Sequence, residues 1–291
     1  MSVVSRKNFD IRKTSQEQKN DSSSGTMGSV DKKAPLLCYE HQSPARKQRQ
    51  HYIACQYRIG GTTLISLRQA INLKSAVDFA ASIGTSLVAH LIVHWVGTDA
   101  GDDPTGELFA RLREMLSLWL RRRGAPFAAV WSREKLSGGQ AEVEHAHLLF
   151  HLPDAWLKGA KLVNVTGGVQ GGVELLQLEA ALSRIVKGCA GRLEHYAVKL
   201  KIPTGGGNPG PYNGRSYDGL YLLKGGGKQA WKLFPRIKRE WRKPQGVIFG
   251  KRCGCTQSLG PTARGRAGYN GESDWWNRAR ELGMKFRSAN H

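Results

Sequence analysis

Hydrophobic residues follow two different periods between residues 75 and 224. Some runs are short and apolar, or alternate apolar with polar positions, as in SLVAHLIVHW at 86–95, and such runs are typical of strands. Elsewhere apolar residues recur every three or four positions, which is typical of amphipathic helices. We therefore expect strands at 86–95, 127–132, 143–152 and 195–202, and helices at 75–83, 103–123, 173–186 and 215–224.

The second of these helices has clear boundary signals. Asp103 suits the N-cap and Pro104 the first helical position. Three arginines, 121–123, complement the dipole at the C-terminal end, and Gly124 suits the residue that ends the helix.

The order of elements is strand, helix, strand, strand, helix, strand, helix. The strands at 127–132 and 143–152 flank a Gly138-Gly139 turn and are expected to pair as an antiparallel hairpin. Antiparallel pairs mixed with helices predict an α+β fold with the helices on one side of the sheet, rather than a doubly wound parallel sheet.

Three segments differ in composition. Residues 1–50 have little periodic hydrophobicity and carry ten basic against five acidic residues, which predicts a disordered basic arm. We expect order to begin between residues 52 and 64, and a catalytic domain to span 51–228. Residues 229–291 are expected to form a basic C-terminal extension that binds nucleic acid; from Tyr221 to the end there are sixteen basic and four acidic residues.

The net charge of the chain indicates which class of partner it binds. The 291 residues include 44 Lys and Arg against 23 Asp and Glu, a formal charge of +21. A polyanion explains such an excess, because each neutralised phosphate releases condensed counterions. A basic surface that only aids solubility is the alternative. The apolar stretch 87–95 is too short to cross a membrane, and residues 1–20 lack a secretory apolar segment. We therefore expect a cytoplasmic protein.

The five cysteines are scattered, odd in number and typical of a reducing compartment. Cys253 and Cys255 are close enough to bind zinc together, but no second pair accompanies them. Two ordinary thiols are the better interpretation.

The segment 143–153, VEHAHLLFHLP, carries the clearest chemical pattern. On a strand its side chains alternate, so Ala146, Leu148, Phe150 and Leu152 face the core. His145, His147, Leu149 and His151 share the other face. Imidazoles two residues apart can converge on one divalent ion, since neutral histidine is a common metal ligand. Incidental surface histidines are the alternative, which the clustering disfavours.

A carboxylate usually completes a two-histidine metal site. Glu134 ends the neighbouring strand and would lie near His145 and His147 if the hairpin forms, although a plain surface carboxylate is an equal alternative. Glu144 is expected to point to the apolar face, and Glu142 lies at the turn.

A second pattern lies at 217–224, YDGLYLLK. On a helix Tyr217, Tyr221 and Lys224 would share one face. A free phenol is a poor nucleophile, but a neighbouring ammonium and a metal-polarised phosphate would both assist its attack. Taken alone, the pattern fits an amphipathic surface helix equally well.

Together, the two segments resemble the motifs of HUH endonucleases. His145-Ala146-His147 is similar to the family's His-hydrophobe-His motif, and Tyr221-Leu222-Leu223-Lys224 to its Tyr-x-x-Lys motif. The resemblance covers roughly residues 85–228. The histidine motif precedes the tyrosine motif, as in rolling-circle replication initiators of plasmids and phages.

The resemblance implies a ferredoxin- or RRM-like antiparallel sheet, with a Mg²⁺ or Mn²⁺ ion held by His145, His147 and Glu134. It also implies a DNA nickase: Tyr221 would attack one strand at an origin, leaving a 5′-phosphotyrosine link and a free 3′-OH, with Lys224 assisting. Tyr217 is a candidate second nucleophile, although Leu220 stands where a lysine would follow it.

The implied setting is a phage- or plasmid-encoded protein in a prokaryotic cell. Its partners would be single-stranded origin DNA, duplex DNA, a host polymerase and a host helicase, since no helicase domain fits in the remaining length. A single-tyrosine HUH transposase and a non-catalytic basic nucleic-acid-binding protein are the alternatives. Trp231, Trp241, Trp275 and Trp276 among the basic residues fit base stacking or ordinary packing equally well.

Overall fold

The computed structural model of the chain describes residues 61–135, 144–163, 168–204, 210–243 and 245–284. The arm expected at 1–50, the Gly138-Gly139 turn and Glu142 lie outside these residues. In the described part, no helix is both long and apolar enough to cross a bilayer. The helices are α2 (Leu67–Ser82), α3 (Glu107–Arg121), α4 (Asp154–Leu157), α5 (Val173–Ala190), α6 (Lys228–Leu233), α7 (Pro261–Arg266) and α8 (Gly271–Glu281).

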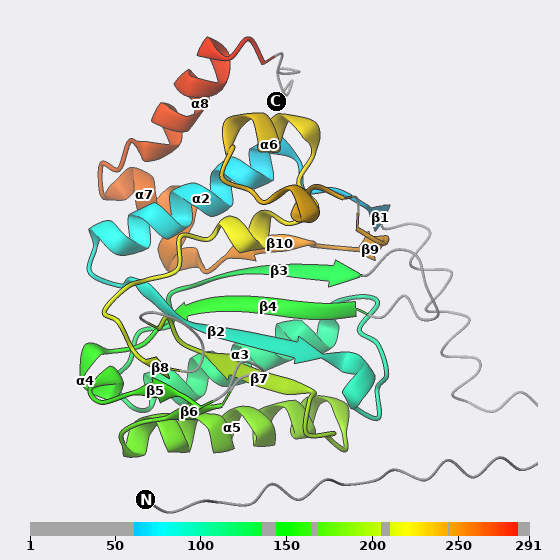
Figure 1. Cartoon of the computed structure of the whole chain (residues 1–291), viewed down its shortest axis with the longest axis vertical. Helices are drawn as coiled ribbons and strands as arrows, with labels where there is room; N and C mark the ends of the chain where they lie inside the picture. Colours follow the sequence, from blue (N-terminus) through cyan, green and yellow to red (C-terminus); the bar gives the residue numbers. More distant parts are fainter. Residues whose placement is uncertain (1–60, 136–143, 164–167, 205–209, 244, 285–291) are drawn as a thin grey trace, which may run out of the picture. The chain divides into compact units, whose positions relative to one another are not determined.

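A five-stranded antiparallel sheet forms the centre of the fold (Figure 1). Its strands, in spatial order, are β10 (Cys253–Cys255), β3 (Ala129–Lys135), β4 (Glu144–His151), β2 (Leu87–His94) and β7 (Val198–Lys201). Shorter strands form two small sheets: β1 (Gly61–Thr62) with β9 (Ile248–Phe249), and β5 (Lys161–Leu162) with β6 (Val169–Gln170) and β8 (Gly210–Pro211). The expected α+β class, with antiparallel pairing, is confirmed.

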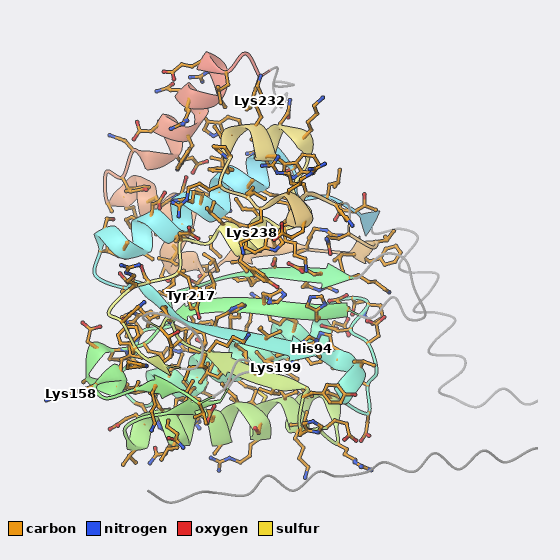
Figure 2. The ribbon with its side chains drawn as sticks, in the orientation of Figure 1. His94, Lys158, Lys199, Tyr217, Lys232 and Lys238 are labelled. Atoms are coloured by element: carbon orange, nitrogen blue, oxygen red, sulfur yellow. The ribbon has the colours of Figure 1, made fainter. Side chains whose placement is uncertain are left out.

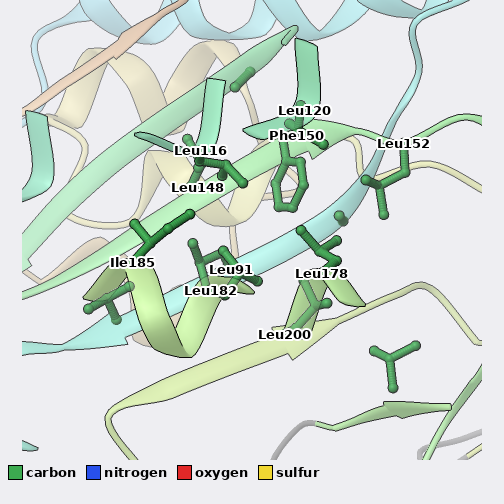
Figure 3. Close-up of a cluster of buried hydrophobic side chains, with 14 of the residues drawn as sticks. Leu91, Leu116, Leu120, Leu148, Phe150, Leu152, Leu178, Leu182, Ile185 and Leu200 are labelled. Carbon is green, nitrogen blue, oxygen red and sulfur yellow. The ribbon is translucent and has the colours of Figure 1, made fainter. Parts of the chain in front are cut away.

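Helices cover both faces of the sheet, so the expectation of helices on one side is wrong. Side chains alternate along β4, and its two faces belong to two separate hydrophobic clusters. Leu148 and Phe150 pack with α3 and α5 in the first cluster (Figure 3). Leu149 packs with α2 in the second. Helix α2 and the C-terminal segments therefore cover part of the histidine face.

The C-terminal residues contribute to this same sheet. Strand β10 pairs with β3, with Gly254 opposite Trp131. Leu233 of α6 and Ala279 of α8 lie in the same cluster as α2. Residues 229–284 thus do not pack as a separate module, and the boundary expected at residue 228 marks no break in the packing.

Helix α3 begins at Glu107, later than the sequence predicts. Gly106 has a φ of 79°, in the left-handed region, and separates the helix from Asp103 and Pro104. The Asp103 carboxylate nonetheless accepts hydrogen bonds from the backbone N–H groups of Leu108 and Phe109, at 3.1 and 2.9 Å. Asp103 therefore caps the helix from a distance.

The helix expected at 215–224 is wrong. The structure has a single 3₁₀ turn, η2 (Leu220–Leu223), after an irregular segment. Gly219 adopts a φ of 74°, and the Asp218 carboxylate accepts from the backbone N–H of Leu220 at 3.0 Å. These local features stop a helix between Tyr217 and Tyr221. The other 3₁₀ turns of the described residues are η1 (Trp95–Gly97), η3 (Arg239–Arg242) and η4 (Gln257–Leu259).

Candidate metal centre

The register between β3 and β4 brings one carboxylate and two imidazoles together. Glu134 lies opposite His145, and Ser132 lies opposite His147. One Glu134 oxygen, Oε2, is 3.3 Å from Nε2 of His145 and 3.6 Å from Nε2 of His147. The three potential ligand atoms lie within 4.8 Å of one another, and all three residues are buried. The closeness of Glu134 to the histidine pair, expected from the hairpin, is seen in the structure.

The donor set fits a divalent metal ion. Both Glu134 oxygens and Nε2 of His147 are buried and make no hydrogen bond of acceptable geometry within the described part of the chain. Glu134 has ion-pair partners at Oε2, but Nε2 of His147 has no hydrogen bond, and a buried polar atom in that state is costly and calls for a ligand. Two imidazoles and a carboxylate suit several first-row metals and leave coordination positions open for a substrate. This group could therefore hold a metal ion.

Charge at the site favours the metal-binding form of Glu134. Burial alone raises the pKa of this carboxyl group, but the nearby imidazoles of His147 and His145 and the Lys224 ammonium outweigh it. The net effect holds the pKa of Glu134 well below its usual value. Burial lowers the pKa of His147, although Glu134 opposes the shift. Glu134 is thus an anion and His147 a neutral imidazole near pH 7, the states that bind metal.

His90 of β2 lies behind the pair. Its Nε2 is 3.0 Å from Nδ1 of His147, and the side chain is 7% exposed. Burial, and then His147, lower the pKa of His90 well below 6.5. Because Nδ1 of His147 is engaged with His90, the free Nε2 of His147 is the atom that faces Glu134.

His94, near the other end of the same strand face, stacks on His145. The ring centroids are 5.4 Å apart and the planes differ by 18°. The β2–β4 register pairs His94 with His145 and Ile92 with His147. Neither His90 nor His94 was predicted from the sequence as part of this site. Their spacing within 86–95 puts them on one strand face, and that signal could have indicated them.

Tyr221 lies against the candidate metal ligands. Its ring centroid is 4.8 Å from that of His147 and 5.6 Å from that of His90, both in edge-on contacts. Tyr217 also meets His90, at 5.5 Å, so the loop brings both tyrosines to the site without the expected helix. Burial raises the pKa of Tyr221 to about 12, with a smaller contribution from Glu134. Burial raises the pKa of Tyr217 further.

Lys224 completes the cluster. Its Nζ atom is 2.8 Å from Oε2 of Glu134 and 5.8 Å from the centroid of the Tyr221 ring. The ammonium therefore pairs directly with the carboxylate that the sequence assigns to the metal. This contact was not expected, since the sequence suggested only that Lys224 assists the attack of Tyr221 on a phosphate.

Other polar residues singled out in the sequence have different partners. Nδ1 of His151 is 3.1 Å from the backbone oxygen of Ser86. Glu144 points to the opposite face, as expected, and binds Arg133 through two hydrogen bonds. Cys253 and Cys255 both have free thiols; Cys253 is buried and Cys255 is half-buried. Neither cysteine joins a group of three potential metal ligands within the described residues.

Comparisons with models of known protein families, with curated proteins and with solved structures give no match. The function of the chain is therefore inferred from the geometry of the site.

Proposed function

We propose that this chain is a DNA-nicking enzyme of the HUH type that initiates rolling-circle replication. The observation that carries the proposal is the contact between Tyr221 and His147, at 4.8 Å between ring centroids. A candidate nucleophile on one segment thereby meets a candidate metal centre on another, 74 positions earlier in the sequence. A histidine cluster without a catalytic role gives no reason for a half-buried tyrosine and a half-buried lysine to converge on it.

The connectivity of the sheet supports the proposal. Strand β2, helix α3, strands β3 and β4, helix α5 and strand β7 follow one another with the spatial strand order β3-β4-β2-β7. This βαββαβ order is that of ferredoxin- and RRM-like sheets. The histidine pair lies on β4, an inner strand, as the resemblance to HUH endonucleases implies.

The reaction follows from the groups present. Tyr221 would attack the phosphorus of a phosphodiester with its phenolic oxygen, and the bond from phosphorus to the 3′-oxygen would break. The phenolic proton leaves the tyrosine, and the 3′-oxygen gains one to become a free 3′-OH. The 5′ phosphate stays on Tyr221 as a phosphotyrosine, so one phosphodiester replaces another and the strand can be rejoined.

The protein groups have distinct roles in this proposal. His145, His147 and Glu134 would hold a divalent ion, such as Mg²⁺ or Mn²⁺, which when bound polarises the phosphate and stabilises charge. Because the pKa of Tyr221 is about 12, its phenol keeps its proton near pH 7. Lys224, which contacts Glu134, would supply a positive charge to the same phosphate. A host polymerase would extend the 3′-OH and a host helicase would unwind the duplex.

The decisive experiment detects the covalent intermediate. The full chain is incubated with Mn²⁺ and a library of random single-stranded oligonucleotides labelled at the 3′ end, because the 3′ fragment stays on the protein. We expect an SDS-resistant labelled band that Tyr221→Phe removes and that joint replacement of His145 and His147 by Ala abolishes. Tyr217→Phe is the matched control and should retain most of the label.

Each other result has a clear meaning. A band that survives Tyr221→Phe and disappears in Tyr217→Phe would reassign the nucleophile. Cleavage without any covalent band would exclude the tyrosine mechanism. Binding of oligonucleotides without cleavage or adduct would favour a non-catalytic nucleic-acid-binding protein.

A further inference from the structure

A cavity of about 610 Å³ opens beside the two tyrosines. Ile92 of β2 and Leu149 of β4 form part of its lining, so it begins on the same sheet face as the histidines. His90 also lines it, and His90 contacts His147 directly. The cavity therefore adjoins the candidate metal centre without including any of the three candidate ligands.

Aromatic side chains form a second part of the lining. Tyr217, Tyr221 and Trp241 all border the cavity. Trp241 belongs to η3, and its ring centroid is 5.0 Å from that of Tyr221 with an angle of 81° between the planes. Trp241 is half-buried. An aromatic and apolar lining suits a flat ring rather than a bare ion.

Positive charge borders the same space. Lys201, Arg236 and Lys238 line the cavity, and Asp218 is the one acidic residue that does so. Asp218 is already paired with Arg236 at 3.2 Å. The Lys238 ammonium lies 5.1 Å from the centroid of the Trp241 ring. Tyr217 lies toward the start of β2 (Figure 2), where its backbone N–H donates to the backbone oxygen of Leu87 at 2.9 Å.

An apolar interior with a cationic rim matches one kind of ligand. In single-stranded nucleic acid, flat bases alternate with phosphates, and proteins bind it by combining aromatic stacking with a positively charged track. Duplex DNA keeps its bases inside the stack and offers none to a cavity of this kind. The lining thus favours a single strand with at least one unstacked base.

We infer that the cavity bordered by Tyr217, Tyr221 and Trp241 is a nucleobase pocket, which takes up an unstacked base of single-stranded DNA close to the phosphate that is cut. This inference rests on the proposed function, since it identifies the part of the substrate that the site grips. Trp241 supplies the stacking surface and Lys238 contacts the neighbouring phosphate. The pocket positions the strand by its base, while the metal centre and Tyr221 act on its backbone.

The test separates base recognition from charge. Binding of the full chain is measured by fluorescence anisotropy in EDTA, which prevents cleavage, with two single-stranded probes of equal length. One probe carries bases and the other is abasic throughout, so their charges are the same. We expect the base-bearing strand to bind about five- to hundredfold more tightly, the range that one stacked base contributes.

The variants then assign the effect to the cavity. Trp241→Ala should remove most of this preference and leave the affinity for the abasic strand unchanged, while Trp241→Phe, which keeps an aromatic face, should retain much of it. Lys238→Ala should weaken both probes to the same extent. Lys158→Ala is the matched control, because Lys158 is an exposed lysine at the end of α4, away from the cavity (Figure 2).

Two results would overturn the inference. Equal affinity for the base-bearing and abasic strands would show that no base pocket exists, and the nicking activity could still stand on its covalent adduct. A Trp241→Ala variant that keeps the full preference, or loses affinity for both probes alike, would place base recognition elsewhere. A chain that binds neither probe would contradict the proposed function as well.

Discussion

The Nε2 atom of His90 lies 3.0 Å from Nδ1 of His147, so one histidine fixes the orientation of another. If His147 donates its Nδ1 proton to His90, its Nε2 lone pair is free to face Glu134. Histidine ligands to metals commonly donate their second N–H to a carboxylate, a carbonyl or water. Here an imidazole of β2 fills that role.

The first prediction concerns this pair. His90→Leu should weaken Mn²⁺ binding about 10- to 100-fold, because the orientation and tautomer of His147 are no longer fixed. His90→Gln offers an amide oxygen as acceptor and should restore most of the affinity. Calorimetric titration of the metal-free chain measures both. If the Leu and Gln variants bind equally, His90 has only a packing role.

The second prediction follows from the contact of Lys224 with Glu134, 2.8 Å between Nζ and Oε2. The ammonium competes with a metal ion for the same carboxylate and repels the ion. Lys224→Met should therefore strengthen Mn²⁺ binding by about tenfold, a charge effect of roughly 1.4 kcal/mol. The same variant should nick about 100-fold more slowly, since a charge that stabilises the phosphate is lost.

Lys228→Met is the control for this prediction, because Lys228 is exposed at the start of α6. It should leave both quantities unchanged. Weaker metal binding in Lys224→Met would mean that the lysine organises the ligands rather than competing with the ion.

The third prediction is a pH dependence of stability. Burial, followed by His145 and Lys199, lowers the pKa of His94 from 6.5 to about 4. Between these values the unfolded chain binds a proton at this position and the folded chain does not. The free energy of unfolding contributed by His94 is therefore complete above pH 6.5 and falls as the pH drops toward 4.

His94→Asn removes this titration and isolates its effect from that of other groups. The free energy of unfolding is measured in urea for the metal-free unaltered chain and for the variant. As the pH falls from 6.5 to about 4, the unaltered chain should lose stability relative to the variant. A difference that stays constant over this interval would show that His94 titrates normally.

The sequence predicted the central part of the site because that part depends on local patterns. Alternation along β4 places His145 and His147 on one face, and a hairpin with β3 brings Glu134 opposite His145. The pairing of β2 with β4 joins residues that are 51 to 64 positions apart in the sequence, and no local pattern gives its register. The spacing of His90 and His94 indicates only that they share a strand face, whereas their contacts with His147 and His145 depend on that register.

Two other features were hidden for similar reasons. A three-residue strand, Cys-Gly-Cys, has too few positions to show a period, so β10 was not predicted from 253–255. In 215–224 the spacing of Tyr217, Tyr221 and Lys224 fits a helix, but the left-handed Gly219 breaks it. The three side chains still converge because Tyr217 is anchored to β2 and Lys224 to Glu134.

The final prediction concerns the opposite face of the same hairpin. The Arg133 guanidinium donates two hydrogen bonds to the Glu144 carboxylate, at 2.5 and 2.9 Å, and both side chains are at most 2% exposed. Arg133 also donates to the backbone oxygens of Asp103 and Phe249. The pair thus ties β3 and β4 to the segment before α3 and to β9.

Breaking one side of this pair should be costly. Burial raises the pKa of Glu144 to about 8, although Arg133 opposes the shift, so the pair is fully charged only above that pH. At pH 9, Glu144→Gln leaves a buried guanidinium without its counter-charge, and we expect a loss of roughly 3–5 kcal/mol in the free energy of unfolding. Replacing both residues with apolar ones, Arg133→Met with Glu144→Leu, should recover part of that loss, since no charge remains buried. The recovery is incomplete because the oxygens of Asp103 and Phe249 lose a donor.

The same variants test whether the pair supports the metal centre. Arg133 and Glu144 are the immediate chain neighbours of Glu134 and His145, which point to the other face of the sheet. A loosened pair should disturb the β3–β4 register and weaken Mn²⁺ binding in Glu144→Gln under conditions where the variant remains folded. Urea unfolding and metal titration together decide the matter. Unchanged stability in Glu144→Gln would mean that the ion pair contributes no more than its desolvation costs, and unchanged metal affinity would confine its role to the opposite face.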